Sequence, residues 1–467
     1  MWKTPFRFCA ANSKIYTMKF LLAMAGLGGL LYGIDFGVIA VSMPYIKVLK
    51  IYTDAQVSWI VGAVMFGGII ASATAGWLCD HFGRKKMIIA GTGLFLVAIP
   101  VVCFSGTSLS VMLTGRILQG MSAGYMAVVM PMYLAETLPA DMRGRGTGIF
   151  QLFLGIGLVT AALMGVLISN VFGASDSDVA DTVKGFAWRL NFWWTLLPVS
   201  ILFIGAFWLK ESPVWLEKVK GAKLKVQASE GEVSVSQPST LLQRKYVIPF
   251  ILAVLVLTFN KTIGMSSIVA YAVSLFQKAG LSGTLGNIGD LALKTTNLIM
   301  TLVAVSLIDR KGRTWLLKVG TAGLTIGLGM IGVMFLAIER GWFSASPVSG
   351  FVTLAAFILM QIFYSLGPGI CVWLVLSELM PTRIRANGMA IALFANQFVA
   401  WGLASSFFPM VNTWGYGLTF FMFAATGVLY FITACFIPET KGKTLDELET
   451  LFERKYTINN SKHNRHD

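Results

Sequence analysis

Long apolar runs separated by short polar turns make up most of this chain. Each run has about 20 residues or more, enough to cross a hydrocarbon core of ~30 Å as a helix. The pattern therefore predicts an all-α membrane protein with about twelve transmembrane helices. The predicted spans are residues 18–46, 56–79, 87–105, 108–134, 144–170, 188–209, 246–275, 288–308, 314–338, 350–380, 385–412 and 415–437.

A charged turn that follows the second span returns after the eighth. The first copy contains Asp80, Gly83 and Arg84, and the second contains Asp309 and Arg313. The copies are about 229 residues apart, close to half of the chain, so the sequence predicts two similar halves. The predicted division is an N-terminal six-helix bundle over 1–209, a cytoplasmic linker over 210–245, a C-terminal six-helix bundle over 246–437 and a cytoplasmic tail over 438–467.

The composition supports a membrane protein and indicates its orientation. Hydrophobic residues make up 56% of the 467 residues and charged residues only 13%, with a net charge of +15. The positive charge does not indicate nucleic-acid binding, because the bases lie in short turns and in the tail. Roughly 18 Lys and Arg lie in the turns of one side and roughly seven in those of the other. The positive-inside rule then places both termini in the cytoplasm.

The sequence offers no pattern for enzyme chemistry. The five cysteines show no CxxC spacing, which argues against a disulfide framework or a metal site. The histidines, His81, His463 and His466, fall in a turn or in the tail, and no nucleophile–base spacing is present. We therefore expect no catalytic residue, no metal and no cofactor.

Two ionisable residues interrupt apolar spans of the first half. Asp35 lies about 11 residues, or ~16 Å, from the outer end of its span, and Arg116 about eight residues, or ~12 Å, from the outer end of its own. A charge at such depth is costly unless it is paired or solvated, and the similar depths allow these two to pair. A conformational change that breaks the pair would drive proton uptake by the aspartate. The alternative is a static ion pair that only fixes helix packing.

Polar side chains gather in the spans of the second half, several turns from either membrane face. They are Asn260, Lys261, Ser266, Asn297, Trp373 and Asn396. Facing a shared cavity, such groups can bind a polyhydroxylated solute. The alternative for Asn297 and Asn396 is hydrogen bonding between helices, and for Trp373 it is packing alone. Lys261 must be neutral, solvated or matched by a negative charge, or its side chain must snorkel to an aqueous vestibule.

An ordered set of motifs resembles the sugar porters of the major facilitator superfamily over nearly the whole chain. The motifs are Gly76–Lys85, Gly115–Arg145, Glu211–Leu216, Gly367–Arg385 and Pro438–Gly442. The resemblance implies the major facilitator fold, two pseudo-symmetric six-helix bundles that rock about a central site. It also implies charge networks that hold the cytoplasmic side closed. Their residues are Asp80, Gly83, Arg84, Glu136, Arg143, Glu211, Asp309, Arg313, Glu378 and Arg385.

The resemblance extends into the membrane, with departures. Asp35 stands where proton-coupled relatives carry aspartate, and Arg116 stands at their partner arginine. Gln151 matches the more cytoplasmic glutamine of span 5 and is expected among the substrate-binding residues, whereas Leu158 stands at the glutamine that contacts sugar in the family. The span 7 motif is also altered, with Lys261 in place of a glutamine. The transport machinery thus resembles that of the family, while the usual hexose contacts are partly replaced.

These features together predict a secondary active transporter. We expect it to move a sugar or related polyol with a co-transported proton by alternating access. The alternatives on the same fold are a facilitative uniporter and a carrier of an anionic organic solute. A solute sensor is less favoured, because the tail over 441–467 is short. We expect a multi-pass monomer in the plasma (bacterial inner) membrane, with lipid, solute and proton as partners and no nucleic acid.

Overall fold

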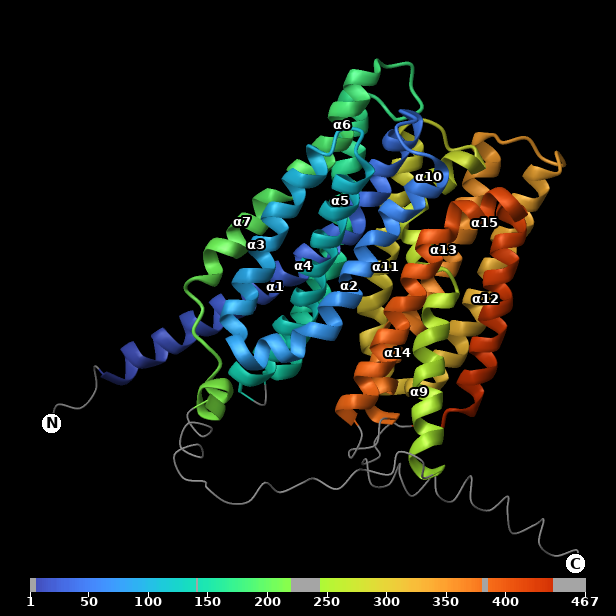
Figure 1. Cartoon of the computed structure of the whole chain (residues 1–467). Coiled ribbons are helices and arrows are strands. Elements are labelled where there is room, and N and C mark those ends of the chain that lie inside the picture. Colours follow the sequence, from blue (N-terminus) through green and yellow to red (C-terminus); the bar gives the residue numbers. More distant parts are fainter. Residues whose placement is uncertain (1–5, 140–141, 220–243, 380–384, 440–467) are drawn as a thin grey trace, which may run out of the picture. The chain divides into compact units, whose positions relative to one another are not determined.

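The computed structural model describes residues 6–139, 142–219, 244–379 and 385–439. Within these ranges the regular elements are α-helices (Figure 1). The helices are α1 (Phe6–Val48), α2 (Asp54–Phe82), α3 (Arg84–Cys103), α4 (Leu109–Thr137), α5 (Arg143–Phe172), α6 (Asp181–Trp193), α7 (Leu196–Ala206), α9 (Arg244–Thr262), α10 (Met265–Ala279), α11 (Thr284–Lys311), α12 (Arg313–Glu339), α13 (Pro347–Leu366), α14 (Pro368–Leu379) and α15 (Arg385–Phe436).

Among the described residues, 11 helical stretches are long and apolar enough to cross a membrane. The last of these, Ile391–Phe436, turns at Gly415, where φ is 83°, and so forms two spans. This confirms the predicted twelve. Three other spans consist of two helices each, namely α6 with α7, α9 with α10, and α13 with α14. Large apolar side chains such as Phe104, Val171 and Leu197 remain exposed, as lipid-facing residues must be.

The sixth span begins earlier than the sequence predicted. It starts at Asp181 rather than at residue 188. Lys184 lies in this added turn and is only 9% exposed, so burial in the fold carries the helix past a charged residue. Local sequence decides other helix starts directly. At the start of α2, Thr53 accepts a hydrogen bond from the backbone N–H of Gln56, whose side chain accepts one from the Thr53 backbone, a reciprocal cap.

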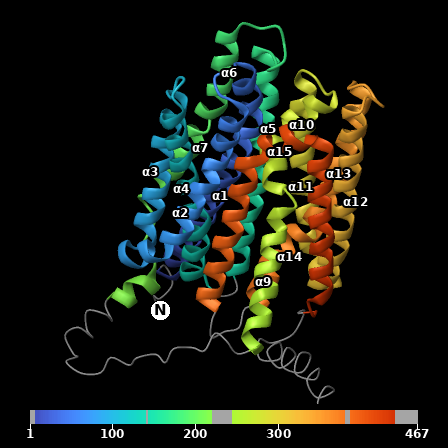
Figure 2. The same cartoon turned by 45° about the vertical axis from the view of Figure 1, so that its right-hand side comes forward.

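The chain forms two compact units. Unit 1 comprises Met1–Val233, Val269–Ser274 and Gly283–Lys294, and unit 2 comprises Ser234–Ile268, Leu275–Ser282 and Thr295–Asp467. In unit 1, α1 packs along α5, and α4 packs on both α2 and α3. In unit 2, α12 packs on α13 and α15, and α9 packs on α14 and α15 (Figure 2). The chain changes unit inside α10, which contributes Val269–Ser274 to unit 1, and inside α11 between Lys294 and Thr295.

Candidate transport site and cytoplasmic networks

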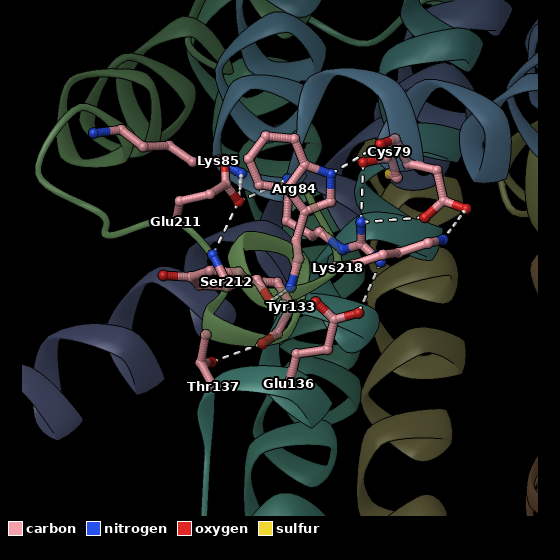
Figure 3. Close-up of polar contacts among 11 residues, drawn as sticks. Cys79, Arg84, Lys85, Tyr133, Glu136, Thr137, Glu211, Ser212 and Lys218 are labelled. Carbon is pink, nitrogen blue, oxygen red and sulfur yellow. Dashed lines mark hydrogen bonds and ion pairs between the residues drawn. The ribbon is translucent and has the colours of Figure 1, made fainter. Parts of the chain in front are cut away.

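The side chain of Glu211 caps the N-terminus of α3 in the first half. Oε1 of Glu211 accepts hydrogen bonds from the backbone N–H groups of Arg84 at 2.8 Å and Lys85 at 3.1 Å (Figure 3). The first N–H groups of a helix have no partner within the helix, and they attract negative charge. Gly83 has φ of 92°, and a Cβ there would lie 2.5 Å from Oε2 of Glu211. Glycine is therefore required at this turn.

The Arg84 side chain extends this cap into a network, which we call the N-terminal network. Its guanidinium is buried and donates to Glu136 at 2.8 Å and to Asp80 at 3.3 Å (Figure 3). Glu136 also accepts the Ser212 hydroxyl, and Asp80 pairs with Lys218 at 2.9 Å. The N-terminal network therefore joins α2, α3, α4 and the segment that follows α7.

The second half repeats the cap, with one N–H group on each carboxylate oxygen. Glu439 accepts the backbone N–H groups of Arg313 at 3.0 Å and Thr314 at 3.1 Å, at the start of α12. Gly312 has φ of 90°, and a Cβ there would lie 2.6 Å from Oε2 of Glu439. We call this the C-terminal cap. The sequence interpretation quoted Glu439 only as part of a motif, and the signal for its role was its repeat of Glu211 about half a chain later.

The structure brings together five of the ten predicted network residues: Asp80, Gly83, Arg84, Glu136 and Glu211. Arg313 takes part in the C-terminal cap through its backbone. The other four predictions lie outside the described side chains. They are Arg143, Asp309, Glu378 and Arg385.

Asp35 on α1 and Arg116 on α4 are both buried in unit 1, at 0% and 1% exposure. They do not hydrogen-bond to each other directly. Arg116 instead donates to Gln119 on its own helix at 2.6 Å and to the Ile60 carbonyl at 3.4 Å. Neither carboxylate oxygen of Asp35 makes a hydrogen bond of good geometry among the described residues, although Asp35 still interacts with the charge of Arg116 and with the amide of Gln119. The sequence interpretation missed Gln119, which lies one turn from Arg116 on the same face of α4.

Two of the predicted substrate residues make hydrogen bonds between helices of unit 2. Asn260 is 6% exposed and donates to the Pro368 carbonyl at 3.3 Å. Asn396 is 2% exposed and donates to the Leu257 carbonyl at 2.8 Å. For Asn396 this is the structural alternative stated above. Each amide still carries an oxygen with acceptor capacity.

Asn297 forms part of a short polar chain that sequence reasoning missed. Its Oδ1 accepts from Thr301 at 3.2 Å and from Ser365 at 3.4 Å, and the Ser365 hydroxyl accepts from Gln361 at 3.0 Å. Gln361 and Ser365 lie on α13, four residues apart, within a long apolar run. That spacing on one helix face was the available signal.

The remaining predicted substrate residues differ in exposure. Ser266 is 7% exposed at the start of α10, Trp373 is 52% exposed on α14, and Gln151 on α5 is exposed. Lys261 is half-buried near the end of α9. Within the described part of the chain, Lys261 forms no hydrogen bond and no ion pair. Its ammonium is therefore available to a solute or to water.

A buried ion pair on α11 also escaped the sequence interpretation. Asp290 and Lys294 lie 2.6 Å apart, and their side chains are 0% and 3% exposed. Opposite charges four residues apart inside a predicted span were the available signal.

The helical fold, the repeated caps and the membrane-buried polar groups define a membrane transporter of the major facilitator class. The family profile described as "Sugar (and other) transporter" matches residues 21–452, and the chain belongs to that family. This membership makes it a transporter and not an enzyme.

Curated relatives align over most of the chain. The galactose-proton symporter of Escherichia coli K12 is 29% identical, covering 92% of this chain and 93% of its own. The D-xylose-proton symporter-like 2 of Arabidopsis thaliana is 31% identical, covering 91% and 88%. The arabinose-proton symporter of Bacillus subtilis is 28% identical, covering 94% and 97%.

Solved structures share the fold. The crystal structure of D-xylose-proton symporter aligns with a TM-score of 0.77 at 23% identity, covering 91% of this chain and 99% of that one. The inward open conformation of the xylose transporter XylE from E. coli aligns with a TM-score of 0.76 at 24% sequence identity, covering 92% of this chain and 98% of that one. These likenesses confirm the predicted major facilitator fold.

Proposed function

We propose that this protein is a secondary active transporter that moves a sugar or related polyol together with a proton by alternating access. The observation that carries the proton coupling is Asp35, a carboxyl group that is fully buried in a membrane helix without a hydrogen-bond partner among the described residues. An unpaired carboxylate is costly in such a place, and a bound proton removes that cost.

The neighbouring arginine supplies the second half of the coupling step. Arg116 is held by Gln119 and by the Ile60 carbonyl. A movement of α4 that turns its guanidinium from Gln119 toward Asp35 would favour the carboxylate and release the proton. The proton is then bound in one conformation and released in the other, which is the requirement for symport.

The solute would be bound by the amides and the aromatic face of the second half. The side-chain oxygen of Asn297 already accepts from Thr301 and Ser365, which leaves its amide N–H groups to donate to a sugar oxygen. Trp373 has an exposed ring that can lie against a sugar. Relatives that are named as galactose-proton and arabinose-proton symporters support both a sugar and a proton. Gln151, Asn260, Ser266 and Asn396 complete the proposed set.

The two cytoplasmic caps would hold the inner side closed. The moving bodies in this proposal are the six-helix bundles 1–209 and 246–437, joined by the linker 210–245. The Lys- and Arg-rich turns support cytoplasmic termini in a plasma membrane protein, which we propose to act as a monomer.

The test is uptake of labelled galactose, arabinose and xylose into proteoliposomes that contain the purified chain. We expect accumulation above the external concentration when the outside is acidic, and collapse of the gradient when a protonophore is added. Equilibration without accumulation under any pH gradient would instead identify a facilitative uniporter.

A second candidate solute is favoured by one residue. Lys261 carries an ammonium that forms no ion pair among the described residues, at a position where the family resemblance implies a neutral glutamine. A carboxylate on the solute would neutralise it. The same uptake assay with a hexuronate in place of the neutral sugar separates the two candidates.

A further inference from the structure

The buried pair Asp290–Lys294 has no place in the transport steps described so far. Both side chains project from one face of α11, because residues four apart lie one turn above each other. A buried ion pair is weak evidence for stability, since apolar residues of similar volume commonly replace such pairs without loss. The pair therefore invites a functional explanation.

Lys294 makes a second contact, with the helix that carries the proton site. Its Nζ donates to the Gly37 carbonyl of α1 at 3.4 Å, and both partners belong to unit 1. Gly37 lies two residues beyond Asp35. The depths agree, because Lys294 is ~15 Å from the start of α11 at Thr284 and Gly37 is ~16 Å from the end of α1 at Val48.

Two more contacts attach the outer part of α11 within unit 1. Thr284 shares a hydrogen bond with Ser169 at 3.0 Å, and the backbone N–H of Gly283 donates to Asp176 at 2.7 Å. The segment Gly283–Lys294 is thereby fixed at its outer end and again at its inner end. Beyond Lys294 the same helix continues into unit 2 and reaches Asn297 within one turn.

We propose that the Asp290–Lys294 pair links proton binding to solute binding. Asp290 positions the ammonium of Lys294, and the ammonium holds α1 beside Asp35. A displacement of Asn297 by a solute is then passed along α11 to the part of α1 that binds the proton. Asp290 and Lys294 are positioning residues, and Arg116 remains the charged group that acts on Asp35 directly. The inference rests on the proposed function, because it needs Asp35 to bind the proton.

Linked sites change each other's affinity by the same factor, so the link is measurable by binding alone. The experiment measures the affinity of the purified full chain for labelled galactose, arabinose and xylose at acid and at alkaline pH. For wild type we expect about tenfold tighter binding of the preferred sugar at acid pH. Asp35→Asn should remove this difference, which tests the proposed function separately.

Two double variants test the link. Asp290→Leu with Lys294→Met removes both charges and keeps the volume. Asp290→Lys with Lys294→Asp keeps an ion pair but moves the ammonium one turn outward, away from Gly37. For both we expect the pH difference to fall to about twofold or less, with affinity at acid pH within about threefold of wild type.

The matched control removes an ion pair that is partly exposed and has no role in the proposed link. Lys47 and Asp54 lie 3.3 Å apart with side chains 37% and 40% exposed, so Lys47→Met with Asp54→Asn should keep the wild-type difference. Retention of the difference in either α11 variant, while Asp35→Asn loses it, would overturn the link and leave the proposed function standing. Retention in Asp35→Asn would overturn the proposed function and the link together.

Discussion

Among the described residues, the buried charged side chains lie in unit 1, and they include Asp35 and Arg116 at 0% and 1% exposure. Unit 1 also buries amides such as that of Gln119, whereas the buried polar side chains of unit 2 are neutral and include the amides of Asn260 and Asn396. A carboxyl group in a membrane interior changes its charge readily when its surroundings change, and an amide does not. The comparison indicates a division of labour, with the proton bound in unit 1 and the hydroxyl groups of the solute met in unit 2.

The capped ends of the two halves, in contrast, are built alike. Glu211 and Glu439 each accept two backbone N–H groups at a helix start, next to a glycine with φ near 90°. The same device in both halves fits a role in opening and closing, which both halves share. The difference between the halves therefore lies in the transmembrane helices and not at the capped ends.

The largest effect is expected from the charge that is central to unit 1. Asp35→Asn should abolish accumulation driven by a pH gradient, because the amide cannot carry the proton. Counterflow exchange of solute should persist, since it needs no net proton movement. Both are measured in the same proteoliposomes. A variant that still concentrates solute would exclude Asp35 as the proton site.

The N-terminal network should affect rate and not binding. Arg84→Ala leaves the partly buried Glu136 without its cation, which costs about 3 kcal/mol or more in such sites. We expect turnover to fall on the order of a hundredfold, with equilibrium solute binding within a few-fold of wild type.

The control for Arg84 is Lys218→Ala, which removes an exposed partner of Asp80 and should change turnover by less than about threefold. The assignment is contradicted if Arg84→Ala weakens binding as much as Asn297→Ala does.

Lys261 is the one charged residue among the predicted substrate-binding residues, and it lies in unit 2. Lys261→Gln introduces the glutamine that the family resemblance implies and makes this position of unit 2 neutral. If an anionic solute is the partner, its transport should weaken at least about tenfold, roughly 1.4 kcal/mol, while neutral sugars are unaffected or improved. Competitive uptake of glucuronate against glucose measures this. Unchanged selectivity with an unchanged pH profile of uptake would leave only a side chain that snorkels to water.

The smallest effect is expected from the two glycine turns beside the capping glutamates. Gly83→Ala and Gly312→Ala should each lower the unfolding temperature by a few degrees, about 1–2 kcal/mol, because alanine disfavours the positive φ and approaches the carboxylate. Gly76→Ala is the matched control, since a Cβ there meets no atom within 4 Å. A shift for Gly76→Ala as large as for Gly83→Ala would show that the turns are not specifically strained.

Much of the fold followed from apolar runs and from repeated motifs. The spans and the first-half network residues were predictable, because span length and charged turns are local properties of the sequence. The start of α6 was not, since tertiary burial of Lys184 overrides the local polarity. The partners of buried groups were also missed. Gln119 takes the guanidinium that the sequence assigned to Asp35, because hydrogen bonding depends on which helix faces meet.

The central claim is that solute and proton cross together through Asp35. The most direct measurement adds solute outside proteoliposomes that have the same pH on both sides. Proton movement into the lumen is followed with an enclosed pH-sensitive dye. The account predicts acidification of the lumen with wild type and none with Asp35→Asn, although both proteins exchange labelled solute in a separate counterflow assay with vesicles preloaded with solute. Solute entry through the wild type without any change in lumenal pH would contradict it.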